Sequence, residues 1–207
     1  MELNPLLYRH LVEQEIRNDL GNRGDISSEY LFSADHTSRI TLRSRAKGVL
    51  SGLEAALYAF YVLAPDLRIV REKKDGQALE SGSVIATIEG KTRSLLSAER
   101  TALNLLGHLS GIASKTSSMV QAIKGTKARI LDTRKTLPGL RSLQKYAVRC
   151  GGGKNHRFGL HDAVMIKDNH LEAVDSLPEA ITRLRQSLGH TVKIEVEVDT
   201  LSRLEEV

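Results

Sequence analysis

Hydrophobic positions in the first hundred residues recur at both helical and strand spacings. Residues 5–20 include Leu7 and Leu11 on the apolar face of a predicted helix, which Gly21 is expected to end. Alternation over residues 39–45 predicts a strand with one polar face. The other predicted elements are helices at 52–63 and about 92–109, and strands at 67–71 and 84–88 on either side of a turn at Asp75-Gly76. The pattern therefore predicts a mixed α/β region.

After Gly111 the pattern changes to a regular alternation of helix and strand. The expected helices are 113–123, 139–149 and 177–187, and the expected strands are 128–132, 163–167 and 192–198. This alternation favours parallel βα units. We therefore place a domain boundary near residue 112, between an N-terminal α/β domain at 1–112 and a βα domain at 113–207.

The second part is short for a closed barrel. A βαβ unit takes about 30 residues and an eight-unit barrel about 250. Residues 113–207 can hold roughly three strands with their helices. The expectation is that this part is the N-terminal portion of a barrel and that the chain is cut inside its second domain.

Composition narrows the class of protein. Apolar residues make up 41% and charged residues 27%, as in ordinary globular proteins. The net charge of +5 could suit nucleic acid, but only 4% of residues are aromatic, which leaves few platforms for stacking bases. Cys150 has no partner for an intrachain disulfide, and the chain has neither a signal-peptide pattern nor a long apolar run. We expect a soluble, cytoplasmic protein that binds neither nucleic acid nor membranes.

Positive charge is concentrated between Asp132 and His170, just past two predicted buried strands. Arg134 and Lys135 follow strand 128–132, and Lys167 ends strand 163–167. Because α/β proteins bind their ligands beyond the carboxyl ends of such strands, the expected ligand is small and carries several negative charges.

The three glycines at 151–153 do not form a known nucleotide loop. A P-loop would need glycine where Val148 stands and serine or threonine where Asn155 stands, and the dinucleotide motif would need glycine at His156. Two interpretations stay open: a flexible loop whose backbone approaches an anion, or a helix C-cap followed by a loop.

Two carboxylates lie on one face of the last predicted strand. Alternation in 192–198 places Glu195 and Glu197 opposite Val196 and Val198. Facing a basic pocket, these carboxylates would hold Mg²⁺ or a sugar hydroxyl.

Four long motifs resemble the quinolinate phosphoribosyltransferase family, whose members are also called carboxylating nicotinate-nucleotide pyrophosphorylases. They are ERTALNLLGHLSGIAS (99–114), LDTRKTLPGLRSLQKYAV (131–148), GGGKNHRFGLHDAVMIKDNH (151–170) and KIEVEVDT (193–200). The resemblance implies an N-terminal α/β open sandwich followed by an incomplete α/β barrel, which is cut short in this chain. It also implies a homodimer or higher homo-oligomer with sites shared between subunits.

The resemblance also assigns roles to individual residues. Arg100 matches an arginine that the partner subunit contributes to the pocket, and Glu197 matches an acid near the ribose and metal end of phosphoribosyl pyrophosphate. Lys135, Lys167 and Glu197 are the expected catalytic residues, with Mg²⁺ expected at Glu197 and no organic cofactor. The expected substrate-binding residues are Arg100, Thr133, Arg134, Lys135, His156, Arg157, Lys167 and Glu197.

The implied reaction joins quinolinate to the ribose of phosphoribosyl pyrophosphate and releases pyrophosphate and CO₂, leaving nicotinate mononucleotide. Either Lys135 or Lys167 could deliver the final proton. A related phosphoribosyltransferase with another acceptor and an inactive fragment are the open alternatives. Residues 75–90 also resemble the hammerhead of biotinyl and lipoyl carriers, but no lysine stands at a hairpin tip there.

Overall fold

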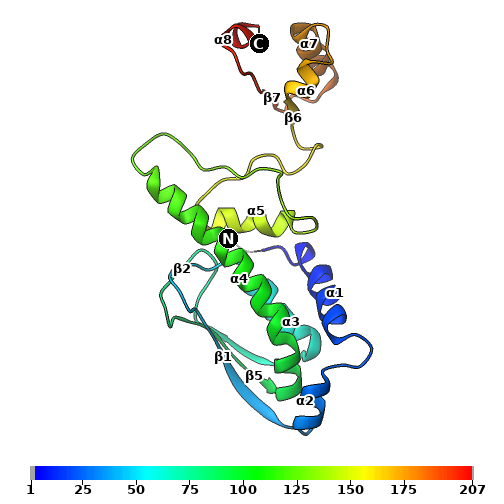
Figure 1. Cartoon of the computed structure of the whole chain (residues 1–207), viewed down its shortest axis with the longest axis vertical. Coiled ribbons are helices and arrows are strands. Elements are labelled where there is room, and N and C mark those ends of the chain that lie inside the picture. Colours follow the sequence, from blue (N-terminus) through cyan, green and yellow to red (C-terminus); the bar gives the residue numbers. More distant parts are fainter. Residues whose placement is uncertain (1–2, 207) are drawn as a thin grey trace. The chain divides into compact units, whose positions relative to one another are not determined.

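The computed structural model describes residues 3–206 and divides the chain into two compact units. The larger unit ends at Asn155 and the smaller one begins at His156 (Figure 1). Both contain helices and strands, so the predicted mixed α/β class is confirmed.

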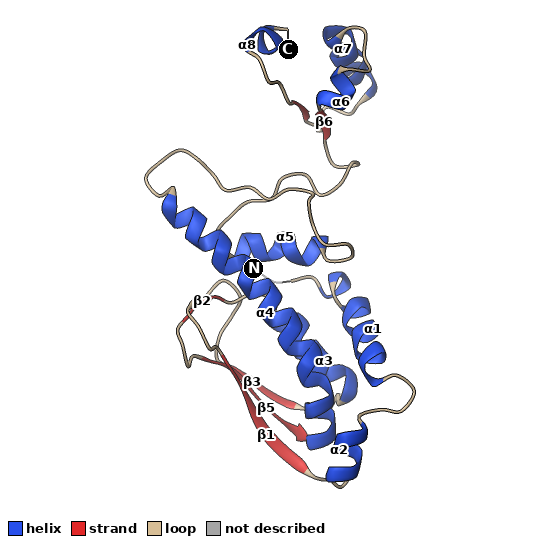
Figure 2. Cartoon of the chain, in the orientation of Figure 1, coloured by secondary structure: helices blue, strands red, loops and turns tan. Residues whose placement is uncertain are grey.

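The larger unit contains an antiparallel sheet and a set of helices packed on one of its faces (Figure 2). Its helical elements are η1 (Pro5–Leu7), α1 (Arg9–Leu20), α2 (Ile26–Leu31), α3 (Leu53–Leu63), α4 (Thr92–Ala122) and α5 (Arg141–Cys150). Its strands are β1 (Thr37–Arg43), β2 (Gly48–Val49), β3 (Arg68–Arg71), β4 (Ala78–Leu79) and β5 (Val84–Lys91).

The main sheet has the strand order β1-β5-β3, and its register separates an apolar face from a charged one. Ile40 of β1 and Ile69 of β3 both pair with Ile88 of β5. One residue along, Arg39 pairs with Glu89, so the two faces alternate as the sequence pattern predicts. The apolar face packs against the helices and forms one side of the core.

The core of the larger unit lies around α3 and α4. Phe60, Leu57 and Leu109 are fully buried in it. Gly52 is the N-cap of α3. Its φ of 85° suits glycine, and a Cβ there would come within 2.4 Å of Leu109. The Asp75 carboxylate accepts the N–H groups of Gly52 and Leu53 at 2.9 and 3.0 Å, which satisfies the helix N-terminus.

Helix α4 runs without a break from Thr92 to Ala122, so the prediction of two helices separated at Gly111 is wrong. A single glycine weakens a helix but does not end it when the flanking faces are packed, and Ala113 beyond it is buried. The predicted boundary near residue 112 falls inside this helix. None of the described helices is both long and apolar enough for a membrane span.

The predicted strand at 128–132 is also wrong as a regular element. The structure forms only an isolated parallel bridge there, between Leu131 and Lys154. Leu131 is half exposed, so this stretch lacks the burial on both faces that the apolar run suggested.

The three glycines serve helix packing rather than anion binding. The N–H groups of Gly151, Gly152 and Gly153 donate to carbonyl groups at the end of α5, so they are not free to cradle a ligand. A Cβ on Gly151 would lie 2.3 Å from the Ala113 carbonyl oxygen of α4. Of the two open interpretations, the helix C-cap is the one that the structure supports.

The smaller unit has a short parallel sheet and a small core. Its elements are β6 (Val164–Ile166), α6 (Asp168–Leu171), α7 (Leu177–Ser187), β7 (Ile194–Val196) and α8 (Leu201–Glu205). Strands β6 and β7 pair in parallel with α7 between them in sequence, as predicted. Ile166, Leu177 and Ile181 are its buried hydrophobic residues.

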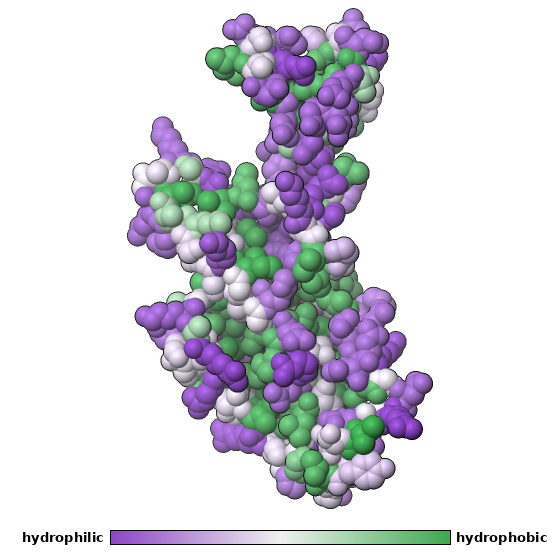
Figure 3. All heavy atoms as spheres, viewed as in Figure 1, coloured by the Kyte–Doolittle hydropathy of each residue, from purple (hydrophilic) through white to green (hydrophobic). Residues whose placement is uncertain are grey.

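On the face drawn in Figure 3, hydrophobic side chains gather over the middle of the larger unit.

Candidate active site

The loop after Leu131 carries the first group of predicted site residues. The Thr133 hydroxyl oxygen accepts the N–H of Lys135 at 3.0 Å, which gives the loop a tight turn. The Nε atom of Arg134 is buried and has no hydrogen-bond partner among the described residues. An unpaired buried guanidinium N–H is costly, so Arg134 is suited to receive an acceptor from a ligand. Lys135 is exposed.

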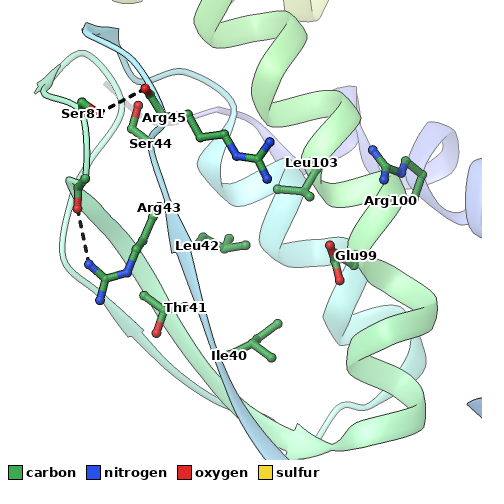
Figure 4. Close-up of a pocket in the computed structure, with 11 residues that line it drawn as sticks. Ile40, Thr41, Leu42, Arg43, Ser44, Arg45, Ser81, Glu99, Arg100 and Leu103 are labelled. Carbon is green, nitrogen blue, oxygen red and sulfur yellow. Dashed lines mark hydrogen bonds between the residues drawn. The ribbon is translucent and has the colours of Figure 1, made fainter.

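Arg100 lies at the rim of a pocket of about 810 Å³ in the larger unit. Strand β1 supplies Ile40 and Leu42, while α4 supplies Leu103 beside Arg100 (Figure 4). The exposed Arg100 side chain is therefore accessible, as a residue offered to a partner subunit must be. Arg45 extends towards the same pocket, while Arg43 donates to the Gly82 carbonyl group.

The smaller unit carries the second group. The His156 ring Nε2 lies 2.8 Å from a carboxylate oxygen of Glu195. Arg157 donates through Nη1 to the Ala163 carbonyl at 2.7 Å, while its Nε is buried without a partner among residues 3–206. Lys167 Nζ lies 3.5 Å from Glu197.

The predicted facing of the two glutamates is confirmed. Glu195 and Glu197 are exposed, whereas Ile194 and Val196 pack against the small core of this unit. Each carboxylate pairs with one predicted site cation, and both pairs are partly exposed to water. Such pairs orient side chains more than they stabilise the fold.

The donor set fits only a weakly held metal. Within the described part of the chain, no three His, Cys, Asp or Glu side chains cluster as a metal site would require. Glu197 offers a single exposed carboxylate. Mg²⁺ is often bound through one or two carboxylates together with substrate phosphates, and that is the arrangement these residues fit.

The predicted residues thus fall into two groups, each ordered within its own unit. That these residues form the site stays a prediction, and sequence reasoning did not predict the residues that support them. Lys145, Asp132 and Asn155 form a buried polar network behind the loop that carries Arg134. The sequence offers no signal for this network, because helical spacing places Lys145 opposite the apolar stripe that contains Leu143 and Ala147.

Comparison with known proteins identifies the family. The model for the N-terminal domain of quinolinate phosphoribosyl transferase matches residues 25–110, and the model for its C-terminal domain matches residues 112–207. The chain belongs to the quinolinate phosphoribosyltransferase family. The family predicted from the motifs is therefore confirmed.

Individual members of this family match most of the chain. The probable carboxylating nicotinate-nucleotide pyrophosphorylase of Bacillus subtilis is 42% identical over 204 residues, which cover 99% of this chain and 70% of that protein. The carboxylating nicotinate-nucleotide pyrophosphorylase of Mycobacterium leprae is 44% identical over 199 residues, which cover 95% of this chain and 70% of that protein.

A solved structure of the same family agrees with this fold. The crystal structure of NadC from Streptococcus pyogenes superposes with a TM-score of 0.95 at 40% identity. The match covers 100% of this chain and 73% of that one. The chain therefore has the fold of an enzyme of the phosphoribosyltransferase kind.

Proposed function

We propose that the chain transfers a phosphoribosyl group from phosphoribosyl pyrophosphate to quinolinate and releases pyrophosphate and CO₂. The product is nicotinate mononucleotide, a precursor of NAD. Family membership and the names of the relatives support this reaction. The observation that carries it is the pair of buried, unpartnered Nε atoms on Arg134 and Arg157.

Cationic residues bind and orient the acceptor. A guanidinium group can hold a carboxylate through two parallel hydrogen bonds, and quinolinate has two carboxylates. Arg134 and Arg157 each have a buried Nε from which no described residue accepts a hydrogen bond, so an acceptor from the ligand would complete their hydrogen bonding. Lys135 adds positive charge next to Arg134 in the sequence, and Thr133 shapes the loop that carries both. His156, next to Arg157 in the sequence, adds a ring nitrogen that can hydrogen-bond the acceptor. Holding the dianion in one orientation lowers the barrier mainly through proximity.

Displacement at the anomeric carbon needs no nucleophilic side chain from the protein. Positive charge develops on the ribose, and Glu197 supplies a carboxylate for its hydroxyl groups. Bound Mg²⁺ would stabilise the charge on the pyrophosphate leaving group. Lys167, beside Glu197, adds a cation at the same place.

Loss of CO₂ leaves a carbanion next to a cationic ring nitrogen. The fixed positive charges of Lys135 and Lys167 stabilise it further. Either ammonium group can deliver the final proton to that carbon.

The active unit is a cytoplasmic homodimer or larger homo-oligomer in which Arg100 reaches the partner's site. Mixing Arg100→Ala chains with Lys135→Ala chains should restore part of the activity, because one hybrid site then has both groups intact. Hybrid dimers that form without any recovery would show that Arg100 acts within its own subunit.

The choice of acceptor tests the function. Calorimetry should show tighter binding of quinolinate than of nicotinate, because the second carboxylate pairs with cations that nicotinate leaves unpaired. Equal affinities, or release of pyrophosphate with another acceptor but not with quinolinate, would favour a related phosphoribosyltransferase instead.

A further inference from the structure

Lys145 of α5 is fully buried although it carries a charge. Its Nζ donates to Asp132 Oδ1, and the side chain of Asp132 is only 7% exposed. With the Asn155 amide oriented so that its nitrogen faces these acceptors, it donates to the second carboxylate oxygen of Asp132 at 2.8 Å. The same amide donates to the backbone carbonyl of Lys145 at 2.9 Å. Asn155 is itself partly exposed, and we call Lys145, Asp132 and Asn155 the buried triad after the fully buried lysine at its centre.

A buried triad of this kind is a poor means of stabilising a fold. Removing an ammonium group from water costs several kcal/mol, and pairing with a carboxylate often does no more than offset that cost. Apolar residues of similar volume commonly give equal or higher stability. The better-attested role of a buried charge pair is to fix one geometry among several, so its location in the structure matters.

Asp132 of the buried triad lies at the start of the loop that carries Arg134. Asp132 is joined to the next segment through its N–H, which donates to the Lys154 carbonyl at 3.2 Å. Lys154 in turn donates to the Ile130 carbonyl at 2.9 Å. The start of the loop is therefore fixed by both backbone and side-chain contacts.

The far end of the same loop is held by the same helix. Arg141 Nε donates to the Thr136 hydroxyl at 3.2 Å, and the Leu137 N–H donates to the Gln144 side chain at 3.1 Å. Arg141, Gln144 and Lys145 are spaced i, i+3 and i+4, so they share one face of α5. This face contacts the loop at both ends and leaves Arg134 and Lys135 between the two anchors.

We propose that Lys145 is a positioning residue that acts through Asp132 to hold residues 132–137 in the conformation that receives the acceptor's carboxylates. The inference rests on the proposed function. Without the triad, Arg134 and Lys135 would have to be ordered by the substrate itself, and the cost would appear as weaker quinolinate binding. A displacement of about 1 Å in a binding group can cost a large factor in rate, so the effect should be measurable.

Three variants separate positioning from stability. Lys145→Met removes the ammonium group and leaves the Asp132 carboxylate without this cation. Lys145→Met combined with Asp132→Asn removes both charges, so stability should largely recover while the ionic anchor stays absent. Arg149→Met removes a cation from an exposed position on the same helix and is the matched control. Melting temperature, quinolinate affinity and steady-state turnover are measured for each.

The expected result is about a tenfold or larger loss of quinolinate affinity in both Lys145 variants, with Arg149→Met unchanged. In the double variant the melting temperature recovers and the affinity does not. Affinity that recovers together with the melting temperature, or stays at the wild-type value throughout, overturns the inference. Absence of turnover in the wild-type enzyme would instead overturn the proposed function, which makes the two failures distinguishable.

Discussion

The two units hold their site cations by different means. In the larger unit, the loop with Arg134 and Lys135 rests on the buried triad and on α5, which packs against α4 in a continuous core. In the smaller unit, His156 and Lys167 are oriented by partly exposed glutamates over a core of three buried hydrophobic residues. Buried anchors fix a side chain at the cost of desolvation, whereas exposed partners orient it cheaply and less firmly.

The largest effect is expected in the core of the larger unit. Phe60 of α3 is fully buried, so Phe60→Ala should lower the free energy of unfolding by about 3–5 kcal/mol. Urea denaturation measures this loss. Val70→Ala, at a position that is 44% exposed, is the control and should change stability by less than about 0.5 kcal/mol. Similar losses for both variants would mean that this core is loosely packed.

In the smaller unit, Ile181→Ala should cost about 2 kcal/mol, at the low end for such a change. Ile181 is 5% exposed, and its small surrounding core can collapse around the missing atoms. Hydrogen exchange should become faster in α7 while α3 of the larger unit keeps its protection. Faster exchange in α3 as well would show that the two cores unfold together.

Arg134→Lys keeps the charge but removes the planar fork. If Arg134 holds a carboxylate, quinolinate affinity should fall by roughly 1–3 kcal/mol. The melting temperature should change little, because the loop contributes few contacts to the core. Calorimetric titration and a thermal melt on this one variant decide the matter, and unchanged affinity would remove Arg134 from the proposed site.

The smallest effect concerns Asp25, the partly exposed N-cap of α2 in the larger unit. Hydrogen bonds from Ser28 hold the pKa of Asp25 below its ordinary value. The stabilisation is therefore present above the unfolded-state pKa and is lost as the pH falls through the folded-state value. Asp25→Asn should remove this acid dependence and cost about 1 kcal/mol or less near pH 7. Thermal melts between about pH 2 and pH 7 should show a melting temperature that varies less with pH in Asp25→Asn than in the wild type. An unchanged pH profile would contradict the assignment of this acid dependence to Asp25.

Periodicity predicted most elements because their apolar faces are buried where the pattern places them. Helix α7 begins and ends at the predicted residues, and β6 and β7 lie within the predicted strands. The pattern failed at Gly111 and at residues 128–132, where tertiary packing decided the outcome. A glycine mid-helix and a short apolar run are both weak signals, since their meaning depends on distant neighbours.

The candidate site shows the same limit. Arg134 and Lys167 could be predicted because they follow apolar runs inside long family motifs. The role of Lys145 could not, because a lysine in an amphipathic helix is ordinarily exposed and its partner lies 13 residues earlier in the chain. The glycine run suggested a ligand-binding loop. The need for glycine there comes instead from close packing, for example of Gly151 against the carbonyl oxygen of Ala113.

The continuous helix α4 has a practical consequence for anyone who divides this protein. The two family models meet between residues 110 and 112, in the middle of that helix. A fragment that starts at residue 112 would lose about two thirds of α4, and Gly151 would pack against the frayed end of a truncated helix. A fragment that stops there would expose Leu109 without the turns that follow it. Sequence-family boundaries are thus poor places to cut this chain, and a cleavage site after Asn155 would leave every helix intact.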